Sequence, residues 1–241
     1  VIYCYKFSQE KRSFTMYTLL LAVIYLAFIS LGLPDSLLGA AWPTIRVDFD
    51  VPLSYMGLVS MIIAGGTIIS GLMSERLTKK FGTRAVVAVS VALTAIALFG
   101  FSTVGQFWQM CLWGIPYGFG AGAIDAALNN YVALYYNSRH MSWLHCFWGV
   151  GTIVSPYIMS YALTHSTWSN GYRNVSYIQF GILAVILIAM PLWKINKDPA
   201  VTEEDKPLLG VRGALKIKGV PTLLIGFYAY CAAETTTMLW A

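Results

Sequence analysis

Four ionisable side chains stand inside long apolar segments of this sequence, and these are Asp35, Asp125, His145 and Glu234. An aspartate at the centre of a membrane helix costs at least roughly 2.5–3.5 kcal/mol on insertion scales, so it normally faces a cavity or a partner. A carboxylate near a helix end can instead reach water, and for His145, close to the start of its segment, both interpretations stay open. Burial favours the neutral form of a carboxylate, which suits a group that binds and releases protons. We therefore predict that Asp35 and Asp125 couple protons to the function of the protein.

The segment around Asp125 predicts a helix with two specialised faces. One stripe at i, i+4 spacing carries polar groups and consists of Tyr117, Ala121, Asp125 and Asn129. The neighbouring stripe carries only small residues and consists of Gly114, Gly118, Gly122 and Ala126. Small residues let helix backbones approach closely in lipid. We expect the second face to pack on another helix, while the first presents an aromatic ring, an acid and an amide to the interior.

The segment around Asp35 is irregular, because Gly32 and Pro34 precede the acid directly. Proline removes a backbone donor and loosens a membrane helix. Transporters place such interrupted helices at their substrate sites, in corresponding helices of internal repeats. Asp35 and Asp125 are each followed by leucine three residues later. This correspondence predicts two three-helix repeats, with the two aspartates in the first helix of each.

The charges inside the apolar segments restrict the solute. No Lys or Arg lies in the interior of any predicted helix, whereas a carrier of phosphate or another anion needs a buried cation. Acids without cations favour proton coupling, a cationic solute or both. Rings and amides suit a neutral polyol. The predicted substrate-binding residues are Asn129, Asn130, His145, Tyr117, Trp42, Trp148 and Glu234.

Composition places the chain in a membrane. Hydrophobic residues make up 57% of it and charged residues 11%, against roughly 25% charged in ordinary soluble domains. The apolar residues form long blocks, which predicts an all-α multi-pass membrane protein. The net charge of +5 is spread over loops, so we expect no nucleic-acid partner. The four cysteines show neither a disulfide framework nor metal-ligand spacing, so we expect no metal and no cofactor.

About 20 residues cross the hydrocarbon core, and on that scale the sequence predicts seven helices. They span residues 14–45, 53–74, 85–102, 107–135, 142–163, 177–195 and 221–241. Residues 1–195 form the predicted N-terminal six-helix bundle, 196–220 a cytoplasmic inter-bundle loop and 221–241 the first helix of a second bundle. The chain begins without Met and stops inside an apolar run. We therefore expect it to be truncated and to lack a C-terminal six-helix half.

The distribution of Lys and Arg predicts the orientation. Most of these residues fall on the side of the N-terminus, and only Arg46 and Arg173 fall on the other side. Because cytoplasmic loops carry the excess of positive charge, we expect a cytoplasmic N-terminus in the cell (inner) membrane.

The order of six helices, a long loop and a seventh helix resembles the N-terminal half of the major facilitator superfamily plus the first helix of its second half. Residues 71–84, between helices two and three, resemble the basic signature of that family. Where the signature has an aspartate, this chain has Lys79. The resemblance implies a gating loop that contains Glu75, Arg76, Lys79, Lys80, Gly82 and Arg84.

Within that superfamily, residues 120–132 are similar to the fourth helix of fucose-permease-like sugar:proton symporters. The acid and amide that line the cavity there map onto Asp125 and Asn129. Residues 144–151 look like the fifth helix of that group, with His145 at a cavity position, and Asp35 falls near the acid of its first helix. The resemblance implies a secondary transporter in the lipid bilayer that takes up a sugar or similar small neutral solute with protons, by alternating access.

Three other functions stay open on the sequence. A proton-coupled exporter of drug-like or cationic compounds would share the acids. A seven-helix receptor is a function of another class, although no lysine follows Lys218 to bind retinal as a Schiff base. A truncated, inactive fragment is the third. We expect no enzyme, because no nucleophile–base pair stands in the predicted helices.

Overall fold

The computed structural model describes residues 2–195 and 211–240, and these ranges contain helices and turns without any strand. The elements are α1 (Ile2–Gly32), α2 (Leu37–Asp48), α3 (Tyr55–Phe81), α4 (Thr83–Phe101), α5 (Phe107–Tyr135), α6 (Ser138–His165), α7 (Trp168–Ala189), the 3₁₀ helix η1 (Met190–Ile195), α9 (Val211–Ala214) and α10 (Val220–Trp240). This architecture confirms the predicted all-α fold. Of the predicted inter-bundle loop, residues 196–210 lie outside the described part.

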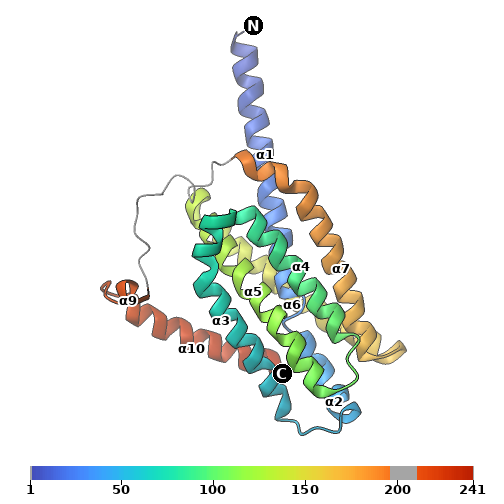
Figure 1. Cartoon of the computed structure of the whole chain (residues 1–241). Helices are drawn as coiled ribbons and strands as arrows, with labels where there is room; N and C mark the ends of the chain where they lie inside the picture. The colour runs from blue at the N-terminus through green and yellow to red at the C-terminus, as the bar shows by residue number, and fades with distance from the viewer. Residues whose placement is uncertain (1, 196–210, 241) are drawn as a thin grey trace.

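Helices α1 and α3–α7 lie side by side in one bundle, the N-terminal part of α1 extends beyond it, and α10 runs across the others (Figure 1). The largest helix–helix interfaces are α3 with α5, α4 with α5, α1 with α6 and α4 with α7. Within the described residues, the main contacts of α10 are with α2. Helix α1 thus packs mainly on α6 and also touches α5 and α7.

Five described stretches are long and apolar enough to cross a membrane: Met16–Asp48, Tyr55–Phe81, Thr83–Phe101, Ser138–His165 and Trp168–Trp193. The chain is thus a multi-pass membrane protein. Helix α5 packs among these spans and carries the polar residues Asp125, Asn129 and Asn130.

The first predicted helix, residues 14–45, was wrong as a continuous element. Helix α1 ends at Gly32 and α2 starts at Leu37, with turns over residues 33–36. Pro34 has no N–H to continue the α-helical ladder. The amide of Asp35 donates instead to Gly32 O at 3.3 Å, three residues back.

The predicted gating loop is also helical over most of its length, which corrects its description as a loop. Helix α3 continues to Phe81, so Glu75, Arg76, Lys79 and Lys80 lie on its last turns. Lys79 Nζ and Glu75 Oε1 form an i, i+4 ion pair at 3.5 Å. The break comes only at Gly82, whose φ of 80° suits a residue without a Cβ, and Arg84 already belongs to α4.

The connection between α6 and α7 is much shorter than predicted. Helix α6 spans Ser138–His165 and α7 starts at Trp168, where the prediction had residues 142–163 and 177–195. The hydroxyl of Thr167 caps α7 by accepting from the amide of Asn170. The first turns of α7 read as polar in sequence, but they bury Trp168, Tyr172 and Val175 against the bundle.

Candidate functional site

The break between α1 and α2 positions Asp35 in the middle of the first span. Pro34 O accepts the amide of Leu37 at 3.1 Å, which starts α2 directly after the acid. Asp35 itself is half-buried. The turn therefore directs the carboxylate out of the regular helical course, toward α5 and α6.

Both oxygens of Asp35 accept hydrogen bonds from other helices. The Tyr117 hydroxyl of α5 donates to Oδ1 at 3.0 Å, and the Trp148 indole N–H of α6 donates to Oδ2 at 2.9 Å. Tyr117 is only 5% exposed. Hydrogen bonds to an ionisable acceptor are among the stronger ones in proteins. The carboxylate of Asp35 thus joins three helices at one point.

Close approach of α1 and α6 sets the position of Trp148. A Cβ added to Gly32 would lie 2.1 Å from Trp148 O, and one added to Gly151 would lie 2.4 Å from Ile29 O. Only glycine fits at such distances, since both neighbours are backbone atoms. The two glycines therefore bring the backbone of α6 against α1, directly beside the bond from Trp148 to Asp35.

Asp125 is held within its own helix. Asn129 Nδ2 donates to Asp125 Oδ1 at 2.9 Å and to its backbone oxygen at 3.0 Å. The other amide atom, Asn129 Oδ1, is buried and has no hydrogen-bond partner among the described residues. His145 of α6 interacts electrostatically with Asp125. The region around Asp125 thus combines a carboxylate, an amide oxygen of Asn129 that has no donor among the described residues, and the imidazole of His145.

The small-residue face of α5 packs on α3, as the sequence predicts. A Cβ on Gly118 would lie 2.3 Å from Ile63 O, and one on Gly122 would lie 2.2 Å from Thr67 O. The hydroxyls of Thr67 and Ser70 donate across the interface to Gly118 O, at 3.3 and 3.4 Å. With this face fixed to α3, the neighbouring stripe holds Tyr117 against Asp35.

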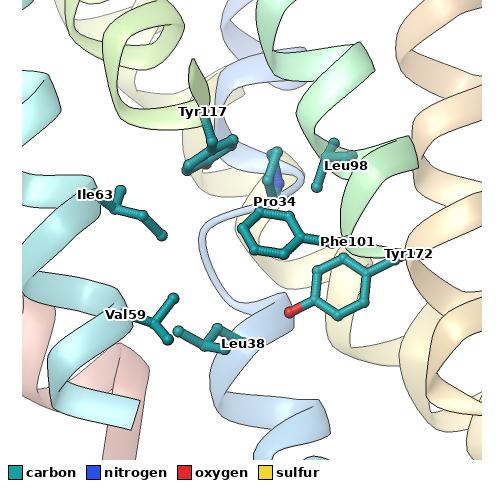
Figure 2. Close-up of a pocket in the computed structure, with 8 residues that line it drawn as sticks. All are labelled: Pro34, Leu38, Val59, Ile63, Leu98, Phe101, Tyr117 and Tyr172. Carbon is teal, nitrogen blue, oxygen red and sulfur yellow. The ribbon is translucent and has the colours of Figure 1, made fainter. Parts of the chain in front are cut away.

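A cavity of about 20 Å³ lies next to the helix break (Figure 2). Its walls come from the break and from α2, α3, α4, α5 and α7, and the lining residues are Pro34, Leu38, Val59, Ile63, Leu98, Phe101, Tyr117 and Tyr172. In Figure 2 the Tyr172 hydroxyl points toward the start of α2. The volume suits about one water molecule. The lining is almost entirely apolar, and the volume is too small for a sugar.

The remaining predicted site residues are only partly brought together. Trp42 is 1% exposed and donates to Leu53 O at 3.0 Å, which ties it to the connection before α3 and not to Asp35. Asn130 is exposed. His145 is also exposed, with its ring 6.0 Å from the ring of Phe28. Glu234 accepts from the Tyr230 hydroxyl at 2.7 Å.

Glu234 thus bonds within α10, and Asp125 within α5. Within the described part of the chain, no three His, Cys, Asp or Glu side chains are close enough together to hold a metal ion.

Sequence comparisons agree with this architecture. Residues 24–241 match the sequence model of the Major Facilitator Superfamily. The yeast (Saccharomyces cerevisiae) Bypass of stop codon protein 6 is 24% identical over 239 residues, which covers 88% of this chain and 48% of that protein. Synaptic vesicle glycoprotein 2C of Rattus norvegicus is 23% identical over 173 residues, or 70% of this chain and 24% of that protein. The human (Homo sapiens) glycoprotein 2A is 21% identical over 188 residues, or 76% and 25%.

The chain spans about half the length of the yeast relative and about a quarter of the two glycoproteins. The family match, in contrast, covers nearly all of the chain. It runs from within the first span, through the helix break and the Asp35 site, to the end of α10. The chain belongs to the major facilitator superfamily.

Proposed function

We propose that this chain forms the first half of a secondary transporter that moves a small solute across the membrane by alternating access. The finer proposal is uptake of a sugar or similar neutral solute together with protons. Family membership supports transport. The resemblance of the fourth and fifth predicted helices to fucose-permease-like symporters supports the choice of solute. A second six-helix half is the proposed partner of this bundle.

The observation that carries the proposal is the hydrogen bonding of Asp35. Its two oxygens accept donors from α5 and α6 at a break in the first span. Adding a proton to this carboxyl removes an acceptor site that holds helices together. Protonation would therefore favour a different arrangement of these helices, and this differential stability is what couples an ion to a conformational change. Asp125 supplies a second site for a proton on the same helix as Tyr117.

The groups around the two acids support a neutral solute. Buried Asn129 Oδ1 has no donor among the described residues, and a solute hydroxyl would supply one. Trp148 presents a half-buried aromatic ring at Asp35, of a kind that suits the faces of a sugar. Where side chains are described, Lys and Arg lie toward helix ends or in connections. The described residues thus offer acceptors and rings, with no cation for an anionic solute.

A second candidate is export of a cationic compound. Asp35, Asp125 and Glu234 all stand inside apolar segments of the chain. Several acids in one region attract a cation and raise its local concentration. This arrangement favours the exporter over a seven-helix receptor or an inactive fragment.

Orientation and gating complete the proposal. The excess of Lys and Arg on one side supports a cytoplasmic N-terminus in the cell (inner) membrane. On that orientation the basic end of α3, with Arg76, Lys79 and Lys80, faces the cytoplasm. We expect the α3–α4 connection at Gly82 to act in gating, together with Glu75 and Arg84.

The test uses the product of the complete gene in proteoliposomes that contain a pH-sensitive dye. Monosaccharides, polyols and organic cations are offered under an inward proton gradient, and both solute accumulation and proton entry are measured. We expect a neutral sugar or polyol to enter with protons. Asp35→Asn and Asp125→Asn should each reduce gradient-driven accumulation about tenfold or more, because an amide cannot carry the proton.

Asp50→Asn is the matched control, since Asp50 is exposed in the connection after α2. This variant should transport like the wild type. If Asp125→Asn accumulates solute with an unchanged dependence on pH, its coupling role is wrong. Movement of organic cations alone, in exchange for protons, would replace the sugar proposal with the exporter.

A further inference from the structure

Helix α7 carries a fully buried amide that hydropathy and charge patterns do not single out. Gln179 is 0% exposed, and its Nε2 donates to the backbone oxygen of Ser30 in α1. Its Oε1 is buried and has no hydrogen-bond partner among the described residues. Burying an amide costs free energy unless its groups are paired. The hydrogen bond to Ser30 O therefore offsets part of the free-energy cost of burying this side chain.

Ser30 O is the carbonyl that Pro34 leaves open. In an α-helix the carbonyl of residue i accepts the N–H of residue i+4, which for Ser30 is Pro34, and proline has no N–H. The neighbouring amides are used elsewhere, since Leu33 donates to Ile29 O at 3.0 Å and Asp35 to Gly32 O at 3.3 Å. An open carbonyl inside a membrane is costly. Gln179 supplies a donor at this position.

We propose that Gln179 is a positioning residue, which replaces the missing N–H of Pro34 and so fixes the helix break that holds Asp35. The turn over residues 33–36 begins within one helical turn of the paired carbonyl. A fixed turn keeps the Asp35 carboxylate within reach of Tyr117 and Trp148. The consequence for transport rests on the proposed function of Asp35, whereas the local role of Gln179 does not.

Ser176 provides a matched control on the same helix. It lies three residues before Gln179, is also 0% exposed, and donates to Ala95 O at 3.0 Å. Ala95 lies inside the regular helix α4, where its carbonyl has an amide partner one turn on. Removing the Ser176 hydroxyl thus deletes a buried hydrogen bond of α7 without opening a carbonyl.

The test is hydrogen–deuterium exchange, read by mass spectrometry on the full chain in lipid nanodiscs. Gln179→Leu should speed exchange of the amides in residues 33–37 about fivefold, since loss of one hydrogen bond shifts local opening by that order. Ser176→Ala should change it less than about twofold. Gln179→Met, which better keeps the unbranched shape, serves if the leucine variant does not fold.

Pro34→Ala separates a donor role from a packing role, because alanine returns the N–H to Ser30 O. In that background Gln179→Leu should have little effect on exchange. An equal effect of Gln179→Leu in both backgrounds would overturn the proposal, as would unchanged exchange in the original background. Faster exchange with unaltered proton-driven uptake would support the role of Gln179 and refute the role of Asp35 in coupling.

Discussion

The contact between α1 and α6 makes Gly32→Ala a sharp test of how Trp148 reaches Asp35. The new Cβ would lie 2.1 Å from Trp148 O and 3.2 Å from the amide nitrogen of Thr152. A carbon–oxygen contact needs about 3.3 Å, so the two backbones must separate by about 1 Å. The bond from Trp148 to Asp35, now 2.9 Å, would then exceed the usual hydrogen-bond range of about 3.2 Å.

The cost of this substitution follows from two effects. Overpacking costs about 1–3 kcal/mol, and loss of the hydrogen bond adds about 1–2 kcal/mol. Removing a helical glycine returns up to about 1 kcal/mol. The net loss of about 1–5 kcal/mol should lower Tm by roughly 2–20 °C in a chain of this size, measured by thermal unfolding in detergent.

Gly149→Ala is the control for that measurement. Gly149 lies on α6, next to Trp148, and no atom lies within 4 Å of a Cβ added there. It should leave Tm unchanged or raise it slightly. Adding Trp148→Phe to Gly32→Ala should cost little more, since the hydrogen bond is already lost. If Gly32→Ala is as stable as Gly149→Ala, or if the two losses add fully, the steric argument fails.

Two further substitutions test other contacts of the bundle by the same unfolding assay. Gly122→Ala should lower stability by about 1–3 kcal/mol, because the added Cβ would lie 2.2 Å from Thr67 O. The control is Gly65→Ala, whose Cβ meets no atom within 4 Å and which should be neutral. Equal stability of the two variants would contradict the close packing of α3 and α5. Trp168→Phe should cost about 1–2 kcal/mol, since the indole N–H of Trp168 donates to Asp48 Oδ2 at 2.6 Å and joins the start of α7 to the end of α2. An unchanged free energy of unfolding would mean that this bond does not hold these two helix ends together.

The sequence was sufficient to predict the class of fold, because apolar runs of spanning length leave few architectures possible in a membrane. It did not show that the first span contains two helices. High hydropathy is continuous from Met16 to Asp48. Hydropathy measures how favourably side chains transfer into lipid, and it carries no information on how backbone groups are hydrogen-bonded. Pro34 marked the irregularity. Whether a proline kinks a helix or ends it depends on what replaces the lost bond, and that donor comes from α7.

The residues of the candidate site were foreseeable one by one, but their pairing was not. Residue type and position in the sequence predict individual roles for Asp35, Tyr117 and Trp148. Their hydrogen bonds depend on how closely α6 approaches α1, which Gly32 and Gly151 decide only once both helices are placed. Gln179 left one usable signal, a single amide in an otherwise apolar run. The role that we propose for this amide follows only from the structure, in which Gln179 donates to the Ser30 carbonyl that Pro34 leaves open.

The two aspartates are held in different ways, and this difference bears on how they could act. Asp35 is bound by donors from α5 and α6, so any movement that separates these helices from α1 must break or replace hydrogen bonds to it. Asp125 is bound by Asn129 of its own helix, so it can move with α5 and keep its partner. A proton on Asp35 therefore changes the stability of the helix arrangement directly, because it competes with interhelical bonds. A proton on Asp125 changes mainly the charge that a solute or His145 experiences. On this physical ground Asp35 is the better candidate for the coupling step and Asp125 for the contact with solute.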